Sequence, residues 1–423
     1  MSLTSAGSRP HGGEERQIVS AAAVERSPLR IAVLVSHPIQ YYAPIFRALA
    51  TRCDLHVFYG QRLTPQQQGA VGFGTTFEWD IDLLSGYAST FLHNVSRKPG
   101  PEHFGGCDTP EIGARLRAGG FDALLVMGWH LKSYIQGIFA AKRMGIPVMV
   151  RGDSHLDTPR SALKRGAKEI IYPVFLRVFD GALYVGQKSR AFYEHYRYPA
   201  ARLFHSPHCV DNDWFAMRAT SEARSAFRRS LEIRDDAFVV LFAGKLEPMK
   251  RPLDVVAAAA RCRAAGRPVE VMVAGAGELE PALRKCASEL GVPTYVLGFC
   301  NQTEMPAAYA AADALVLPST GGETWGLVAN EALACGRPVI VSEACGCAPD
   351  LAADGEAGRV TPVGDVDGIA AAIDSVMREP PLKSAIDERS RSHSIARAVD
   401  GISACAASVA GRIVANADSN RSV

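Results

Sequence analysis

The sequence predicts an α/β protein made of two doubly wound parallel-sheet domains that face each other with a cleft between them. The chain has 423 residues, of which 48% are hydrophobic, so it can bury the cores of two or three domains. Short apolar runs alternate with segments of helical period, as in domains built on a parallel sheet. The alternation stops over Val210–Phe215, which shows neither period, and then restarts. We therefore place the inter-domain connection at or just after this segment.

The first half of the chain opens with Arg30–Ser36, a short apolar run rich in β-branched residues that is typical of a buried parallel strand. A helical pattern follows, and strands and helices then alternate. Gly145–Pro147 forms a turn before the strand that begins at Val148. The further strands are expected at 55–59, 121–127, 148–150, 181–186 and 203–204, and the helices at 44–51 and 132–144.

The second half repeats the same architecture, starting with the apolar strand Phe238–Ala243. Ligands of such sheets bind beyond the carboxyl ends of the strands, so two facing domains would enclose a binding cleft. The remaining strands are expected at 269–274, 294–297, 314–317 and 339–341, and the helices at 252–265, 281–290, 305–312, 325–335 and 366–378.

These patterns divide the chain into five segments. The expected boundaries are a disordered tail over 1–29, a first domain over 30–212, a second domain over 213–385, a helical segment over 386–415 for which a return to the first domain is one option, and a tail over 416–423.

Composition argues against several classes of protein. The net charge of +2 is too small for a nucleic-acid binder that relies on bulk charge. No apolar run reaches the roughly 20 residues of a membrane-spanning helix, and residues 1–29 lack the apolar stretch of a signal peptide. Of the ten cysteines only Cys345 and Cys347 lie close together, too few ligands for a zinc site. We therefore expect no metal, no disulfide framework, and a reducing cytoplasm.

The strongest chemical signal is Pro318–Gly326, a loop between a predicted strand and a predicted helix. Gly321 and Gly322 allow the chain to turn tightly. The helix is expected to begin near Thr324 or Trp325, where its free N–H groups and positive dipole end would suit a phosphate.

Two carboxylates, Glu323 and Glu331, flank the start of this helix. Their spacing corresponds to a rise of roughly 12 Å if both were helical, which is about the reach from a sugar across a diphosphate to a ribose. Carboxylates accept hydrogen bonds from hydroxyl groups and repel phosphate, so one at each end suits such a ligand. Two solvated surface glutamates are the alternative, and the strand, loop and helix around them favour the binding role.

A second signal lies at the end of the first strand of the second half. Gly244 turns the chain there, and Lys245, Lys250 and Arg251 precede the next helix. Three cations at a strand end would neutralise a diphosphate, whereas the same residues elsewhere would form an ordinary solvated basic loop.

A third signal, Gly275–Gly277, looks like a truncated dinucleotide fingerprint. Glu280 stands where the third glycine would be, and no acidic residue ends a following strand about 20 positions on. Nicotinamide binding is therefore not favoured. A close approach of the backbone to a nucleotide and a simple tight turn are the two alternatives.

In the first half, Ser36–Tyr42, Gly128–His130 and Arg151–His155 each follow a predicted strand and would line the cleft from the other side. A histidine at such a position either contacts substrate or serves as a hydrogen-bonded structural residue. The residues for which both roles stay open are His37, His130, Asp153 and His155.

Residues 160–179 combine basic and apolar side chains in a helical pattern that Pro173 interrupts. A basic amphipathic helix of this kind can rest on an anionic membrane surface. An ordinary surface helix packed on the sheet is the alternative. The cations concerned are Arg160, Lys164, Arg165, Lys168 and Arg177.

Taken together, these motifs resemble those of the large family of retaining glycosyltransferases with a GT-B fold and an E-x7-E motif, the family 4-like or group 1 enzymes. The resemblance covers nearly all of residues 236–375, and the first half resembles a subset with a His-Pro-Ile-Gln-Tyr motif, here His37–Tyr41. The matching segments of the second half are Gly244–Lys250, Gly275–Gly277, Gly298–Phe299, Pro318–Ser319, Glu323–Gly326, Glu331–Ala332 and Gly336–Val339.

The resemblance implies transfer of a sugar from a nucleoside diphosphate sugar to an acceptor hydroxyl, with retention of anomeric configuration and without a metal or other cofactor. Lys245 and Lys250 would bind the donor diphosphate, Glu323 the donor sugar and Glu331 the ribose. Lys245 departs from the family's usual arginine, keeping the charge and losing the bidentate fork.

The acceptor would be a glycan, a glycolipid or a small molecule held by the first domain, as in polysaccharide, glycolipid or glycoside synthesis. The enzyme would work in the cytoplasm, with or without contact to the inner face of the membrane. The candidates for direct participation are Lys245, Lys250, Glu323, His130 and Asp153. The expected donor-binding residues are Gly244, Lys245, Lys250, Gly275, Gly277, Phe299, Glu323, Thr324, Trp325, Gly326, Leu327 and Glu331. The expected acceptor-side residues are His37, Gln40, Tyr41, Trp129, His130, Arg151 and His155.

Two other functions remain open at this point. One is a sugar-nucleotide epimerase or a phosphorylase of the same fold, which would convert a nucleotide sugar or a glycan without this donor loop. The other is a non-catalytic protein that binds nucleotide sugars, against which the intact Glu323, Lys250 and Glu331 argue.

Overall fold

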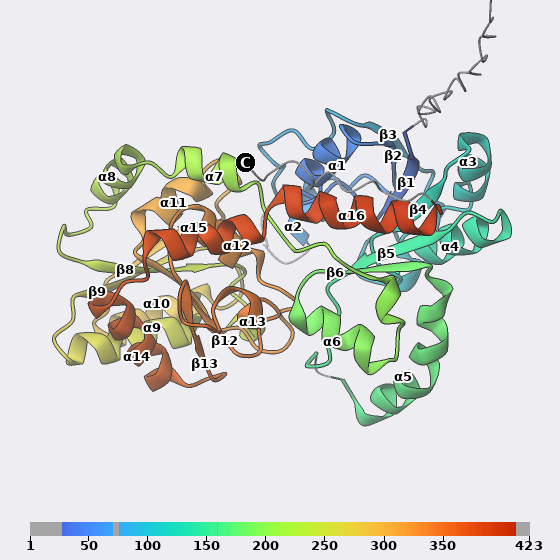
Figure 1. The fold of residues 1–423 in the computed structure, drawn as a ribbon. Helices are drawn as coiled ribbons and strands as arrows, with labels where there is room; N and C mark the ends of the chain where they lie inside the picture. Colours follow the sequence, from blue (N-terminus) through green and yellow to red (C-terminus); the bar gives the residue numbers. More distant parts are fainter. Residues whose placement is uncertain (1–27, 71–75, 159, 412–423) are drawn as a thin grey trace, which may run out of the picture.

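The computed structural model describes residues 28–70, 76–158 and 160–411, and they form two parallel-sheet domains joined by a short linker (Figure 1). The tails expected at both ends fall largely outside these ranges. Among the described residues, no helix is long and apolar enough to cross a membrane.

The first domain is built on a seven-stranded sheet in the order β3-β2-β1-β4-β5-β6-β7. All its pairings are parallel; for example, Ile31 of β1 lies opposite Leu55 of β2 and Ala123 of β4. The order reverses beside β1, which is where doubly wound sheets bind ligands. The strands are β1 Arg30–Val35, β2 Asp54–Tyr59, β3 Ala88–Phe91, β4 Ala123–Val126, β5 Val148–Gly152, β6 Gly181–Tyr184 and β7 Leu203–His205.

The second domain has a six-stranded sheet in the order β10-β9-β8-β11-β12-β13, again with parallel pairings throughout. Its order reverses beside β8, so the strand ends of β8 and β11 open on the cleft. The strands are β8 Phe238–Ala243, β9 Val269–Ala274, β10 Thr294–Gly298, β11 Ala314–Leu317, β12 Val339–Ser342 and β13 Gly358–Thr361.

Helices connect the strands of both sheets. The α-helices are α1 Ala43–Ala50, α2 Pro65–Ala70, α3 Ile112–Gly119, α4 Lys132–Arg143, α5 Ala162–Phe175, α6 Gln187–His195, α7 Asn212–Arg218, α8 Ser221–Ser230, α9 Pro252–Ala264, α10 Glu280–Leu290, α11 Met305–Ala311, α12 Leu327–Ala334, α13 Ala348–Leu351, α14 Val366–Arg378, α15 Lys383–Ser392 and α16 Ile395–Val409. Short 3-10 helices lie at η1 Phe104–Gly106, η2 Leu176–Val178, η3 Ala200–Arg202 and η4 Pro248–Lys250.

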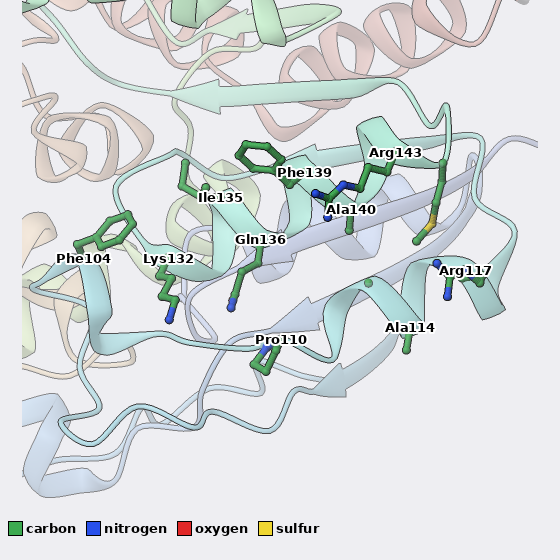
Figure 2. Close-up of a pocket in the computed structure, with 12 residues that line it drawn as sticks. Phe104, Pro110, Ala114, Arg117, Lys132, Ile135, Gln136, Phe139, Ala140 and Arg143 are labelled. Carbon is green, nitrogen blue, oxygen red and sulfur yellow. The ribbon is translucent and has the colours of Figure 1, made fainter.

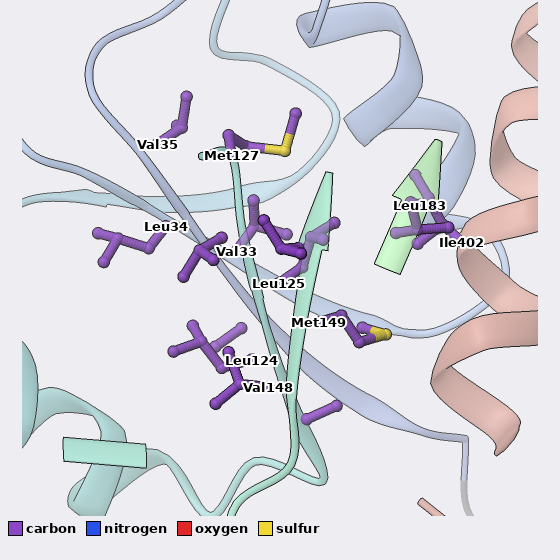
Figure 3. Close-up of a cluster of buried hydrophobic side chains, with 14 of the residues drawn as sticks. Val33, Leu34, Val35, Leu124, Leu125, Met127, Val148, Met149, Leu183 and Ile402 are labelled. Atoms are coloured by element: carbon purple, nitrogen blue, oxygen red, sulfur yellow. The ribbon is translucent and has the colours of Figure 1, made fainter. Parts of the chain in front are cut away.

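The last helix, α16, runs from the second domain back onto the first, where it packs on α1, β6 and β7 (Figure 1). Its apolar face completes the core of the first domain, because Ile402 is buried with side chains of the central strands (Figure 3). Gly401 lets this helix approach closely, since a Cβ there would lie 1.8 Å from the carbonyl oxygen of His205. The two domains are therefore joined by two chain crossings, the linker after β7 and the segment between α15 and α16.

Two local structures differ in detail from the sequence predictions. The inter-domain connection was placed at or just after Val210–Phe215, which shows neither period, and helix α7 begins within it at Asn212, capped by the Asp211 side chain, which accepts from Trp214 N. Seven residues are too few to reveal a helical period. The helix expected over 325–335 begins only at Leu327, so Glu323 lies in the preceding loop and not on the helix.

Candidate functional site

The donor loop, residues 318–326, links strand β11 to helix α12 and lies at the cleft. Gly326 is the N-cap of α12 with φ +102°, a conformation that side chains disfavour. A Cβ there would also lie 2.6 Å from the Leu317 side chain. The described residues supply no side-chain cap to α12, and the Ala329 N–H donates to the Gly326 carbonyl, so the N–H groups of Leu327 and Val328 are those that an anion would meet.

Glu331 lies on the buried face of α12, with only 3% of its surface exposed. Its two carboxylate oxygens accept hydrogen bonds from two tyrosine hydroxyls, Tyr309 at 2.7 Å and Tyr41 at 3.0 Å. Burial raises the pKa of Glu331 to about 7, although both hydrogen bonds favour the charged form. The carboxylate is thus held by one residue of its own domain and by one residue of the other.

Glu323 lies within the donor loop, close to the Lys250 ammonium and the Ser319 hydroxyl. Its Oε2 atom accepts from the Lys250 ammonium, which is carried by η4, and from Ser319 Oγ at 3.2 Å. Lys245 lies nearby, and burial lowers its pKa. The predicted charge cluster of Lys245, Lys250 and Glu323 therefore exists in space and is largely shielded from solvent.

A cavity of about 90 Å³ joins the predicted donor residues Gly244, Gly275, Phe299 and Glu331. The first domain contributes Trp79 and the two motif residues Gln40 and Tyr41 to the same cavity, whose other members are Ala243, Ala274, Cys300, Gln302, Met305 and Val328. Side chains of both domains therefore line this pocket.

Glycine is required at the end of β9, at Gly275 and Gly277, for steric reasons. A Cβ on Gly275 would lie 1.8 Å from the carbonyl oxygen of Gly244, and a Cβ on Gly277 would lie 2.6 Å from that of Leu246. Both glycines also have φ near +155°. They let the loops after β8 and β9 touch, which shapes the floor of the donor pocket.

A second cavity of about 320 Å³ lies in the first domain at the carboxyl ends of β1, β4 and β5. It brings together several acceptor-side candidates from separate segments of the sequence. Its lining residues are Ser36, His37, Ile39, Tyr42, Pro101, Met127, Gly128, Trp129, His130, Tyr134, Arg151, Gly152, Asp153 and Ser154. Burial lowers the pKa of His37 to about 4 and also lowers that of His130, so both imidazoles are neutral near pH 7.

Four of the residues expected on the acceptor side have other surroundings or further contacts in the structure. Gln40 and Tyr41 line the donor cavity and not the acceptor cavity. His155 is fully buried outside both cavities, and neither ring nitrogen has a hydrogen-bond partner among the described residues. Arg151 borders the acceptor cavity, but its guanidinium donates to the Ser206 hydroxyl and to the carbonyls of Ser206 and Pro207, which tie it to the linker.

Asp153 links the acceptor cavity to the donor loop, because it borders the cavity and also contacts Thr324. Its Oδ2 atom accepts from Thr324 Oγ1 at 2.7 Å and lies 3.8 Å from His208 Nε2. Enclosure in the cleft alone would raise the pKa of Asp153. The contacts with His208 and Thr324 outweigh that effect and hold the pKa well below its usual range.

Sequence reasoning missed several residues of this site. His208, Tyr309 and Ser319 contact predicted site residues from elsewhere in the chain, and Phe77 packs on Phe299 with ring centroids 4.3 Å apart. No spacing rule links these positions. The aromatic segment around Phe77 and Trp79 was the one visible signal, because exposed aromatic residues in a polar loop often cover a binding site.

A larger cavity of about 670 Å³ lies outside the cleft, on the outer face of the first domain between α3 and α4 (Figure 2). Phe104 and Phe139 border it together with Arg117, Lys132 and Arg143. It shares no lining residue with the two cavities described above. Within the described chain, no three His, Cys, Asp or Glu side chains gather as a metal site would require.

Two facing parallel-sheet domains with a cleft between them define the GT-B class of proteins. Solved structures share this fold. The Anabaena protein HepE in complex with UDP aligns with a TM-score of 0.66 at 18% identity, covering 90% of this chain and 100% of its own. A glycosyltransferase from Rickettsia africae aligns with a TM-score of 0.68 at 12% identity, covering 90% and 98%.

The second domain can be assigned more narrowly. Residues 223–393, within and just beyond the second domain, match the model of the family described as glycosyl transferases group 1.

The sequence relatives are named as sugar transferases. The GDP-mannose-dependent alpha-(1-6)-phosphatidylinositol monomannoside mannosyltransferase of Mycolicibacterium smegmatis is 31% identical over 244 residues, which are 56% of this chain and 60% of the relative. The D-inositol 3-phosphate glycosyltransferase of Streptomyces bingchenggensis is 39% identical over 154 residues, 34% and 33% respectively. The chain thus spans less than two thirds of the length of these relatives.

Proposed function

We propose that this protein transfers a glycosyl group from a nucleoside diphosphate sugar to an acceptor hydroxyl, with retention of anomeric configuration and without a metal. The observation that carries the proposal is the pairing of Glu323 in the donor loop with Glu331 on the following helix α12, with Lys250 beside the first. This set lies in the segment that matches the group 1 glycosyl transferase model and faces the acceptor cavity of the first domain.

The geometry supports a different role for each group that would contact the donor. Lys245, Lys250 and the uncapped start of α12 would stabilise the diphosphate as it leaves and gains negative charge. Glu323 would bind hydroxyls of the sugar and Glu331 those of the ribose. In this mechanism the leaving phosphate oxygen takes the acceptor proton, so no protein nucleophile is needed.

The acceptor would enter the cavity bordered by His37, His130 and Asp153. Neutral His37 and His130 can each donate or accept a hydrogen bond, as recognition of a hydroxyl requires. Closure of the two domains would exclude water and limit hydrolysis of the donor.

A donor screen tests this function. Thermal shift against UDP- and GDP-linked sugars should give one or a few stabilising donors, because a ligand that binds only the folded state raises Tm. The hit is then incubated with and without a lysate that supplies acceptors. Transfer only in the presence of acceptor is expected. Conversion of the nucleotide sugar alone would indicate an epimerase, and binding without transfer would indicate a non-catalytic protein.

We also propose that the acceptor is met at an anionic membrane surface, on the cytoplasmic face, through residues 160–179. Helix α5 buries none of its side chains, and Leu163, Ile170 and Val174 are 83%, 78% and 72% exposed. Cations of the same segment lie beside this apolar ridge, a pattern suited to anionic lipid. The helix follows directly on the loop that borders the acceptor cavity.

Vesicle flotation tests the membrane contact. Vesicles containing phosphatidylglycerol should capture the protein and pure phosphatidylcholine vesicles should not. Ile170→Ser should reduce capture. Leu382→Ser is the matched control, since Leu382 is 72% exposed on the second domain. Equal capture of both variants, or none by either vesicle, would contradict the contact.

A further inference from the structure

His208 lies in the linker between the domains, and its backbone is fixed by both of them. Its N–H donates to the Val185 carbonyl of the first domain at 3.2 Å. Its carbonyl accepts from Asn330 Nδ2 of the second domain, also at 3.2 Å. The side chain is 6% exposed, so the imidazole stays at the domain boundary.

The imidazole lies between Asp153 of the first domain and Trp325 in the donor loop of the second. On one side its Nε2 atom is 3.8 Å from the Asp153 carboxylate. On the other side its ring centroid is 5.3 Å from that of Trp325 in the donor loop. Trp325 is itself held, because its indole N–H donates to Asn330 Oδ1 at 2.8 Å.

Asp153 extends this contact into the donor loop, since Thr324 donates to the same carboxylate at 2.7 Å. The Asp153 side chain is 43% exposed and would be free to turn toward solvent without these partners. Thr324 follows Glu323 directly. The three side chains therefore form a chain of contacts, His208 to Asp153 to Thr324, from the linker across the acceptor cavity to the donor loop.

We propose that His208 is a positioning residue for sugar transfer, which holds Asp153 against Thr324 and thereby sets the donor loop relative to the acceptor cavity. The inference rests on the function proposed above. Two-substrate reactions depend steeply on such placement, because a shift of about 1 Å costs on the order of 100-fold in rate. His208 need not touch either substrate for this effect.

Two substitutions of His208 separate positioning from simple packing. His208→Leu fills the space without a donor, whereas the amide of His208→Gln reaches toward Asp153. We expect kcat to fall about 100-fold in the leucine variant, with most of it restored in the glutamine variant and with donor KM changed by less than about threefold. The matched control is His205→Leu, a solvent-exposed position on β7 with wild-type kcat expected. Equal losses in both His208 variants, or wild-type kcat in His208→Leu, would overturn the proposal.

A double-mutant cycle tests whether His208 acts through the chain of contacts that ends at Thr324. Thr324→Val removes the far end of the same chain of contacts, so the loss in His208→Leu/Thr324→Val should not exceed the larger single loss. Losses that multiply would overturn the proposal. Should His208→Leu fail to fold, His208→Asn, whose shorter amide does not reach Asp153, takes its place with the same expected losses.

Failure of the proposed function gives a different result from failure of this inference. If the wild-type protein transfers no sugar, the function fails whatever the variants do. The cycle is then measured on the free energy of unfolding in urea. Non-additive losses of stability there support the chain of contacts through His208, and additive or absent losses overturn it.

Discussion

Tyr41 of the first domain donates a hydrogen bond of 3.0 Å to the Glu331 carboxylate of the second domain, 290 residues away in the chain. Glu331 is the residue assigned to the donor ribose. The tyrosine hydroxyl therefore stands where a ribose hydroxyl would donate. In this closed arrangement the donor must displace Tyr41 or share the carboxylate with it.

Tyr41→Phe should consequently tighten nucleotide binding. It removes the competing donor and leaves Tyr309 to hold Glu331. A hydrogen bond to a charged group contributes about 1.5–3 kcal/mol net, so Kd for the preferred nucleoside diphosphate should fall roughly 10- to 150-fold. Calorimetry measures this directly. A weaker affinity would mean that Tyr41 binds the donor and does not compete with it.

The Glu331 carboxyl should also make stability depend on pH. Its pKa is about 7 in the folded protein, above the usual value of 4.5, so the folded state binds more protons than the unfolded state between these values. The free energy of unfolding therefore loses this contribution as pH rises from about 4.5 to 7, by about 3 kcal/mol in total. The loss is complete above the folded pKa.

Glu331→Gln removes this titration, so the difference between variant and wild type should change in favour of the variant from pH 5 to pH 8. Urea unfolding at both pH values measures it. The same variant should raise donor KM, because an amide is a poorer acceptor for ribose hydroxyls. A pH-independent difference would show that Glu331 ionises normally in the folded protein.

Lys250→Ala should impair both binding and chemistry. The ammonium contacts Glu323 and lies in the cluster assigned to the leaving diphosphate. Loss of one such electrostatic partner typically lowers kcat by about 100- to 1000-fold. Steady-state kinetics with the preferred donor measures this. Lys285→Ala is the matched control, because Lys285 is 75% exposed on α10 and pairs only with Glu289 among the described residues. Unchanged kcat and Kd in Lys250→Ala would remove the phosphate assignment.

The sequence was most informative where strands are buried on both faces. The interior strands β1, β4, β8 and β11 read as apolar runs and were located within a few residues. Two of the edge strands, β3 and β13, were missed for the opposite reason. β3 is Ala-Ser-Thr-Phe with no buried side chain, and β13 carries Arg359 and a 38%-exposed Val360. A strand exposed on one side lacks the continuous apolar pattern that marks a parallel core strand.

The residues of the site also fall into two sets, those that the sequence could indicate and those that it could not. The proposed donor residues that each lie in a motif of a single loop, Glu323 after β11 and Lys250 after β8, could be proposed from the sequence because a local motif indicates their chemistry. The contacts across the cleft could not. Tyr41 with Glu331 and Asp153 with Thr324 are set by how two separately folded domains dock, which no local period encodes.

Gly186→Ala tests whether docking of the two domains requires the close contact at Gly186. Gly186 precedes α6 in the first domain, and a Cβ there would lie 2.3 Å from the Trp325 ring and 2.8 Å from Asp350 Oδ2. Trp325 cannot easily move, since Asn330 holds its indole. Asp350 also caps α6 from the other domain by accepting from Gln187 N at 3.0 Å.

The added methyl group should therefore force the domains apart, at a cost of about 1–3 kcal/mol for overpacking. A larger radius of gyration by small-angle X-ray scattering and a lower kcat are expected. Gly166→Ala is the matched control, because that glycine lies in α5 with no neighbour within 4 Å of an added Cβ. Alanine there should leave activity unchanged and slightly favour the helix. Wild-type scattering and kcat in Gly186→Ala would mean that catalysis does not require the contact between Gly186 and Trp325.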